Sequence, residues 1–178
     1  MLELLNRPAI EVAPLVLGAV VRVGEVAVRI TEVEAYMGEE DPGSHAFRGP
    51  GKRNAVMYGP PGHLYTYFTY GMHTCANVVC MPEGIASAVL LRAGEVIEGQ
   101  SVAAKRRVTS QKSADLAMGP ARLVVALGIR LDDAGANLQT GRVRLELPES
   151  QSPFSAGPRT GVAGEGGEQA DPDHGTEL

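Results

Sequence analysis

The longest predicted strand reads Val26-Ala27-Val28-Arg29-Ile30-Thr31-Glu32-Val33-Glu34-Ala35-Tyr36. Alternation by twos, which is typical of a half-buried strand, places six side chains on one face: Val26, Val28, Ile30, Glu32, Glu34 and Tyr36. Glu32 and Glu34 stand where this pattern calls for apolar residues. A carboxylate on an apolar face loses hydration and becomes a better proton acceptor than a solvated one. The segment is therefore a candidate active site, unless the strand leaves the core after Ile30 and both glutamates are solvated.

Length and composition predict one domain, because 178 residues with 44% hydrophobic side chains suffice for a single core. Cys75 and Cys80 lie in an apolar, strand-like run, so we expect reduced thiols and neither a zinc nor an iron–sulfur site. The apolar stretch 12–21 is short and contains Pro14. We therefore expect neither a signal peptide nor a membrane span, and a cytoplasmic location.

The formal net charge of −5 is unevenly distributed. Residues 161–178 contain five acidic and no basic side chains, so residues 1–160 are neutral overall. Within them, residues 92–130 carry a local excess of four basic side chains. Such a patch can contact phosphates, or it can be a solvated helix face, and charge alone does not separate the two.

The pattern of apolar and turn residues predicts an α+β fold, a single mixed domain with a curved, largely antiparallel β-sheet and peripheral helices. We expect six strands, at 19–23, 26–36, 63–70, 72–81, 85–92 and 142–147. We expect three helices, at 8–17, 94–112 and 121–127. The strands on either side of Tyr70-Gly71-Met72 form a protruding β-hairpin, and a long loop rich in Gly and Pro covers 37–62. Disorder is expected from about Gly164 onward.

Three of these features fit one kind of chemistry. Residues 63–70 form the most aromatic run of the chain, beside a partly desolvated carboxylate and a local basic patch. An enzyme that acts on a base inside duplex DNA must first extrude the nucleotide, at a cost of a few kcal/mol. Stacking on aromatic side chains offsets that cost by about 1–3 kcal/mol per base.

A series of motifs in a fixed order makes the interpretation more specific. They are Glu32-Val33-Glu34-Ala35-Tyr36, His45, Arg53-Asn54-x-x-Met57, Pro61-Gly62-His63-Leu64-Tyr65-Thr66-Tyr67, Tyr70-Gly71-Met72, Cys75-Ala76-Asn77, Leu90-Leu91-Arg92-Ala93 and Gly119-Pro120-Ala121-Arg122-Leu123. Between about residues 8 and 162, the chain resembles the alkyladenine (3-methyladenine) DNA glycosylase family of the mammalian type. The resemblance implies a monofunctional DNA glycosylase of base excision repair that hydrolyses the N-glycosidic bond of alkylated or deaminated purines. The implied bases are 3-methyladenine, 7-methylguanine, hypoxanthine and ethenoadenine.

The resemblance also implies roles for ten residues. Glu34 matches the general base that activates a water, and Arg92 matches an arginine that helps to hold that water. Tyr36, His45 and Tyr67 match residues that contact the extruded base, and Asn77 matches one that discriminates against normal guanine. Tyr70 matches the residue that wedges into the duplex, with Met72 beside it in the minor groove, and Arg53 and Arg122 are expected to contact phosphates. No metal and no cofactor are implied.

The resemblance assigns residues 1–162 to a glycosylase domain and leaves 163–178 as an acidic, disordered tail. The expected partner is double-stranded DNA with damaged purine bases, bound by a monomer. Past Gly157-Pro158-Arg159-Thr160-Gly161-Val162 the family continues into a strand containing tryptophan, whereas this chain has no tryptophan. We therefore expect the closing strand to be absent or replaced.

Two other functions are compatible with the same residues. A non-catalytic lesion-binding or DNA-binding protein on this scaffold would keep the tyrosines and lose turnover. A metal-dependent nuclease could use Glu32, Glu34 and Asp41, although the sequence lacks the usual spacing of an Asp followed by Glu-x-Lys.

Overall fold

The computed structural model describes residues 1–110, 112–151 and 153–159 of the chain. The predictions for the tail, 163–178, and for a closing strand after Val162 lie outside these residues. Within the described part, no helix is both long and apolar enough to cross a membrane.

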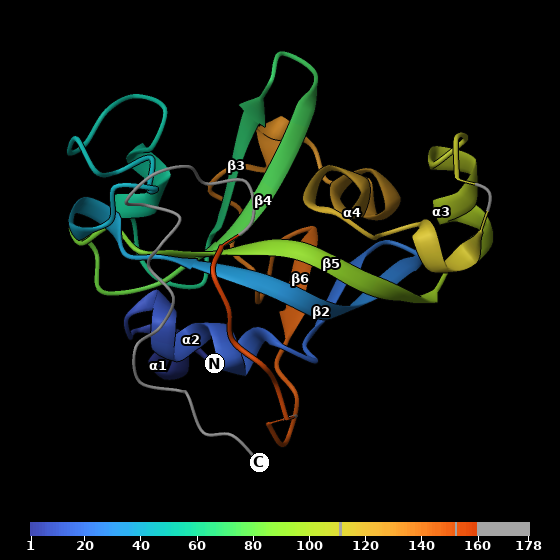
Figure 1. Cartoon of the computed structure of the whole chain (residues 1–178), viewed down its shortest axis with the longest axis horizontal. Coiled ribbons are helices and arrows are strands. Elements are labelled where there is room, and N and C mark those ends of the chain that lie inside the picture. The colour runs from blue at the N-terminus through green and yellow to red at the C-terminus, as the bar shows by residue number, and fades with distance from the viewer. Residues whose placement is uncertain (111, 152, 160–178) are drawn as a thin grey trace.

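A curved, antiparallel sheet of six strands forms the centre of the described fold (Figure 1). Its strands are β1 (Val20–Val23), β2 (Val26–Tyr36), β3 (Leu64–Thr69), β4 (His73–Val79), β5 (Ala88–Glu98) and β6 (Val143–Glu146). They lie in the order β3-β4-β5-β2-β1-β6, so β2 and β5 are the central pair. The predicted α+β class with an antiparallel sheet is confirmed.

Short helices surround the sheet. The α-helices are α1 (Leu2–Leu5), α2 (Ala9–Val16), α3 (Gln100–Arg106) and α4 (Pro120–Leu127). The 3-10 turns are η1 (Gly38–Glu40), η2 (Ala55–Tyr58), η3 (Ser113–Asp115) and η4 (Leu131–Asp133). α2 packs against β2 on one side, and α4 packs against β5 and β4 on the other (Figure 1). α4 begins at Pro120 and ends at Gly128, which has a left-handed φ of 74°, as the sequence predicted.

The loop 37–62 has a small hydrophobic cluster of its own. Ala46 and Met57 from the loop pack with Tyr65 of β3 and with Val79 and Ala88 at the ends of β4 and β5. This cluster holds the loop, which contains little regular structure, against β3 and the ends of β4 and β5. His45, which precedes Ala46 in this loop, lines the same cavity as Tyr36.

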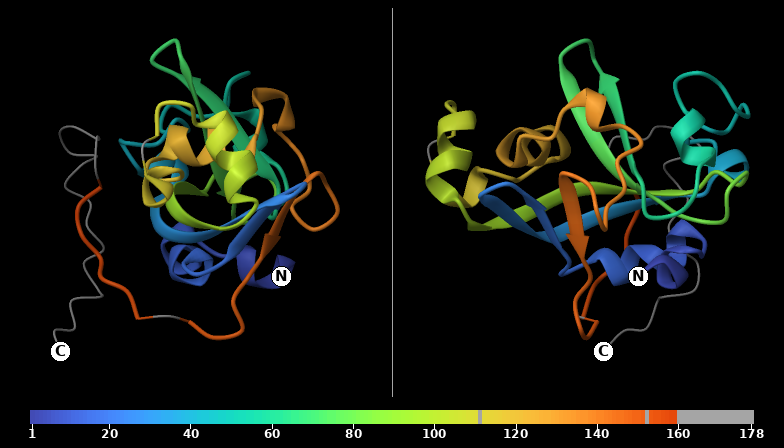
Figure 2. Two further views of the ribbon diagram at one scale, coloured as in Figure 1. Left: turned by 90° about the vertical axis from the view of Figure 1, so that its right-hand side faces the viewer. Right: turned by 180° about the vertical axis from the view of Figure 1, so that it is seen from behind.

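The hairpin β3–β4 projects from the body of the protein, as Figure 2 shows from two sides. Its strands pair from Leu64↔Val78 to Thr69↔His73, so Tyr70, Gly71 and Met72 form the tip. Tyr70 has a φ of 50° and Gly71 a φ of 66°, which is the left-handed geometry that a tight hairpin turn requires. The predicted protruding hairpin is confirmed.

The pairing of β2 with β5 contains two irregularities at the candidate site. The register runs from Ile30↔Gly94 to Glu32↔Ala93 and then to Val33↔Leu91, so one residue on each strand lacks a partner. Such bulges break the simple alternation of side chains. The prediction that Glu32 and Glu34 share one environment was therefore wrong: the Glu32 side chain is 50% exposed and the Glu34 side chain 6%.

Two other predictions were wrong around residue 94. The strand expected at 85–92 begins at Ala88 and continues to Glu98, and the helix expected at 94–112 is only α3 with a turn after it. Gly94 is part of the strand because β2 runs very close to it. A Cβ at Gly94 would lie 2.4 Å from Val28 Cγ1 and 2.6 Å from the Arg29 carbonyl oxygen. The glycine allows close strand packing and does not end the strand.

Candidate active site

Glu34 lies on β2 and is buried among polar partners. Its Oε2 accepts a hydrogen bond of 2.9 Å from the Tyr36 hydroxyl, and its Oε1 lies 3.2 Å from Arg92 Nη1 on the neighbouring strand β5. Arg92 Nε also donates to Glu32 Oε1 at 2.8 Å. One guanidinium therefore joins the exposed and the buried carboxylate, and the structure places Arg92 directly beside Glu34.

Burial and charge set the protonation of the groups around Glu34. Burial lowers the pKa of Arg92, but the hydrogen bond that Arg92 donates to Glu32 and the charges of Glu34 and Glu32 outweigh it, and the net effect raises that pKa. Burial and the charge of Glu34 raise the pKa of Tyr36 well above its ordinary value. Arg92 is thus a permanent cation, and the Tyr36 hydroxyl remains a proton donor at neutral pH.

Aromatic side chains from the loop and from β3 form a pocket next to Tyr36. A cavity of about 50 Å³ is lined by Tyr36, Gly43, Ser44, His45, Met57, Tyr65, Tyr67 and Asn77. The His45 and Tyr67 rings meet edge to face, with their centroids 4.4 Å apart, and the Tyr65 and Tyr67 centroids are 5.7 Å apart. The structure therefore brings the four residues predicted to bind a base, Tyr36, His45, Tyr67 and Asn77, around one cavity.

Hydrogen bonds fix the polar groups of this pocket. His45 Nδ1 is 3.1 Å from the Tyr65 hydroxyl, and Asn77 Nδ2 donates to the Tyr65 carbonyl oxygen at 3.0 Å. Asn54 Nδ2 donates to the His45 carbonyl oxygen at 2.9 Å. Burial, and then the nearby Arg53 charge, lower the pKa of His45, which keeps its imidazole neutral at pH 7.

A larger cavity of about 1070 Å³ runs along β2, between α2 and the segment 153–159. Glu34 and Arg159 line this cavity, whereas Tyr36 lines the smaller aromatic one. The Tyr36–Glu34 hydrogen bond thus lies where the two cavities approach each other. Solvent in the larger space can reach the surroundings of Glu34.

The hairpin tip carries exposed apolar side chains. Tyr70 is 84% exposed and Met72 68%, and Phe68 beside them is also exposed. Arg53 Nη2 donates to the Phe68 carbonyl oxygen at 3.1 Å, and its guanidinium carbon lies 5.8 Å from the centre of the Tyr67 ring. Arg53 is therefore held at the junction of the hairpin and the aromatic pocket.

The arginines of the predicted basic patch, 92–130, lie in different surroundings. Arg92 is in the buried site, Arg106 Nη1 donates to the Ala126 carbonyl oxygen at 2.9 Å, and Arg107 Nε donates to the Leu116 carbonyl oxygen at 3.0 Å. These two arginines hold segments of the protein together. Arg122 is exposed on α4.

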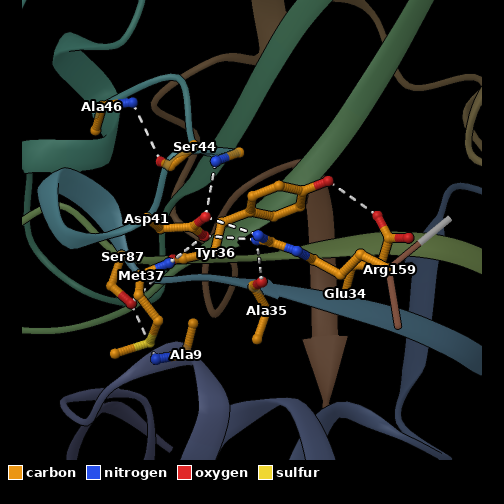
Figure 3. A network of polar contacts seen from close by, with 11 residues as sticks. Ala9, Glu34, Ala35, Tyr36, Met37, Asp41, Ser44, Ala46, Ser87 and Arg159 are labelled. Atoms are coloured by element: carbon orange, nitrogen blue, oxygen red, sulfur yellow. Dashed lines mark hydrogen bonds and ion pairs between the residues drawn. The ribbon is translucent and has the colours of Figure 1, made fainter. Parts of the chain in front are cut away.

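The sequence interpretation missed three residues of the site. Tyr65 was part of a quoted motif without a role, and Asp41 was named only as a metal ligand. Arg159 lies in the quoted Gly157-Pro158-Arg159 segment, and its guanidinium forms an ion pair with Asp41 and lies over the Tyr36 ring (Figure 3).

The three carboxylates considered for a metal site bind arginines instead. Arg92 contacts Glu32 and Glu34, and Arg159 contacts Asp41. In the described part of the chain, no group of three or more His, Cys, Asp or Glu side chains is arranged to hold a metal ion. The geometry at Glu34 thus favours chemistry by a buried carboxylate that is hydrogen-bonded and ion-paired.

Comparisons with known proteins give matches over most of the chain. The family model described as methylpurine-DNA glycosylase matches residues 3–170. A protein of Leifsonia xyli subsp. xyli is 60% identical over 173 residues, which are 92% of this chain and 81% of that protein. A protein of Streptomyces avermitilis is 52% identical and covers 93% of this chain and 82% of its own length. A protein of Cutibacterium acnes is 50% identical, and the match covers 89% of this chain and 87% of that protein.

All three relatives carry the name "Putative 3-methyladenine DNA glycosylase". The family match spans nearly the whole chain, and the relatives align over most of their own length. The chain belongs to the methylpurine-DNA glycosylase family and is a hydrolase, a DNA N-glycosylase for the repair of alkylation damage.

Proposed function

We propose that this protein removes alkylated and deaminated purines from double-stranded DNA by hydrolysis, with Glu34 as the general base. The proposed substrates are 3-methyladenine, 7-methylguanine, hypoxanthine and ethenoadenine. The activity is assigned to residues 1–162, acting as a monomer in the cytoplasm. The observation that carries the proposal is the buried carboxylate of Glu34, held by Tyr36 and Arg92 next to an aromatic pocket.

Base extrusion is assigned to the hairpin. Tyr70 enters the gap that the flipped nucleotide leaves in the duplex, and Met72 lies beside it in the minor groove. Both side chains are exposed at the tip of a projecting hairpin, where they are free to meet DNA. Arg53 and Arg122 contact phosphates, which orient the duplex and carry no sequence information.

The extruded base is assigned to the aromatic pocket. Tyr36, His45 and Tyr67 contact the purine ring. A purine that carries a positive charge from alkylation binds more tightly, because the electron-rich faces of the tyrosine rings attract a cation. Asn77 donates to the Tyr65 carbonyl oxygen, which fixes its amide. We assign discrimination against normal guanine to this fixed amide.

Hydrolysis then takes place at the sugar. A water gives one proton to Glu34 while its oxygen bonds to the anomeric carbon, and the purine leaves with the electrons of the N-glycosidic bond. Arg92, 3.2 Å from Glu34 Oε1, helps to hold that water. The negative charge of Glu34 also stabilises the oxocarbenium character of the sugar in the transition state.

Leaving-group chemistry explains why alkylated purines suit this site. Alkylation at a ring nitrogen makes the base cationic, so it departs as a neutral molecule without further help. A neutral lesion such as hypoxanthine needs a proton on the leaving base, which makes it the more demanding substrate and a sensitive probe of the site.

The test is base release by Glu34→Gln, which keeps the size of the side chain and removes its charge. We expect the variant to bind duplex DNA containing hypoxanthine as wild type does, and to release the base at less than about one hundredth of the wild-type single-turnover rate. The measurement is made in EDTA, where wild type is expected to be fully active. Near-normal release by the variant refutes the role of Glu34, and loss of wild-type activity in EDTA refutes a metal-independent reaction. Lesion binding by wild type without release identifies the non-catalytic alternative.

A further inference from the structure

Arg159 connects the segment 153–159 to the candidate active site. Its two terminal nitrogens each donate to one oxygen of Asp41, Nη1 to Oδ2 at 2.5 Å and Nη2 to Oδ1 at 2.7 Å. Nη1 also donates to the Ala35 carbonyl oxygen on β2 at 3.0 Å. The Arg159 side chain is 7% exposed and the Asp41 side chain 1%, so this bidentate ion pair is buried (Figure 3).

Asp41 is itself held rigidly by its own loop. Its Oδ2 accepts from the Met37 backbone amide at 3.0 Å, and its Oδ1 accepts from the Gly43 amide at 2.9 Å. Burial raises the pKa of Asp41, but the hydrogen bonds from Arg159 and these amides outweigh it and hold the pKa below its usual value. The carboxylate is therefore charged at neutral pH and fixes where the guanidinium lies.

The guanidinium that Asp41 fixes lies on the face of Tyr36. The carbon at the centre of the guanidinium is 4.6 Å from the centre of the Tyr36 ring. The hydroxyl of the same ring donates to Glu34 (Figure 3). A continuous series of contacts thus runs from Asp41 through Arg159 and Tyr36 to Glu34.

We propose that Arg159, held by Asp41, is a positioning residue that sets the plane of the Tyr36 ring and so the direction of its hydrogen bond to Glu34. This inference rests on the proposed role of Glu34. We assign the effect of Arg159 on the reaction to its contact with the Tyr36 ring. Lysine cannot replace it, because an ammonium group lacks the planar fork that binds a carboxylate with two hydrogen bonds and stacks on a ring.

A purely structural role for Arg159 predicts a different result. A residue that only attaches the segment 153–159 to the body would change stability or DNA affinity, and would leave the chemical step of the folded, bound enzyme unchanged. A positioning residue changes the rate of base release at saturating enzyme. Its effect also depends on the hydroxyl of Tyr36.

The experiment measures single-turnover release of hypoxanthine from a duplex oligonucleotide over a range of enzyme concentrations. For Arg159→Lys we expect the maximal rate to fall about tenfold, with the half-saturating enzyme concentration within about threefold of wild type. The matched control is Arg142→Lys, which alters another Arg–Asp ion pair, that of Arg142 with Asp133. This control is expected to change neither quantity by more than about twofold.

A double-mutant cycle with Tyr36→Phe shows whether the effect passes through the hydroxyl. In the Tyr36→Phe background, which keeps the ring, Arg159→Lys is expected to lower the rate by less than about twofold. A tenfold loss in both backgrounds, or no loss in either, overturns the proposal.

If circular dichroism shows that Arg159→Lys does not fold, Asp41→Glu, which keeps the charge, tests the same contacts by the same cycle. An inactive wild type instead refutes the proposed function.

Discussion

Tyr36 and Glu34 stand two residues apart on β2, and the Tyr36 hydroxyl donates to Glu34 Oε2 at 2.9 Å. Residues at this spacing share a face of a strand, so their side chains can meet. Arg92 contacts the other oxygen of the same carboxylate. Tyr36 and Arg92 therefore hold the two carboxylate oxygens from two different strands and orient the Glu34 side chain.

The first prediction concerns the Tyr36 hydroxyl. Tyr36→Phe removes the hydrogen bond to Glu34 and keeps the ring, so we expect the single-turnover rate of base release to fall about tenfold, because a hydrogen bond to a charged group contributes about 1.5–3 kcal/mol. Tyr58→Phe is the matched control, since the Tyr58 hydroxyl donates to Glu39 at 3.0 Å outside the aromatic pocket. Equal rates for wild type and Tyr36→Phe would contradict the importance of this contact.

The second prediction separates the two glutamates. Both contact Arg92, but the Glu32 side chain is half exposed and solvent screens its charge. Glu32→Gln is therefore expected to change the rate of base release by less than about threefold. The rate of base release by Glu34→Gln, measured in the same single-turnover assay, provides the comparison. A larger loss for Glu32→Gln than for Glu34→Gln would transfer the role of general base to Glu32.

Local signals explain why much of the fold could be predicted from the sequence. Pro120 and Gly128 marked the ends of α4, and Tyr70-Gly71-Met72 marked the tip of the hairpin. These residues act on their own backbone, so their effect is visible in a short stretch of sequence. The family motifs added the positions of Glu34, Tyr36 and Arg92, whose roles remain proposals.

What the sequence could not show depends on contacts between distant segments. The irregular pairing near Arg92 arises from how β2 meets β5, and neither strand shows it alone. The strand was predicted to end at Arg92, before Gly94, because the close approach of Gly94 to Arg29 exists only in the folded sheet. Asp41 and Arg159 are 118 positions apart, and no periodicity links them.

The third prediction concerns the hairpin tip. Tyr70→Ala removes an exposed aromatic ring, so we expect affinity for duplex DNA containing hypoxanthine to fall by about 1–3 kcal/mol, the usual contribution of one stacking contact. The free energy of unfolding should change by less than about 0.5 kcal/mol, because the side chain contributes little to the core. Binding is measured in the Glu34→Gln background, in which base release does not interfere. Unchanged affinity would contradict insertion of Tyr70 into the duplex.

The last prediction is the acid sensitivity of the Asp41–Arg159 pair. The folded pKa of Asp41 lies below its unfolded value near 3.8, so its contribution to stability is fully present above that value and is lost as the pH falls through the folded pKa. Asp41→Asn removes the charged carboxylate that binds the buried Arg159 with two hydrogen bonds, which we expect to cost about 3–5 kcal/mol near pH 7. The difference in unfolding free energy between wild type and Asp41→Asn, measured by urea denaturation, should shrink steadily below about pH 4. A difference that stays constant from neutral to acid pH would show that the charge of Asp41 does not stabilise the fold.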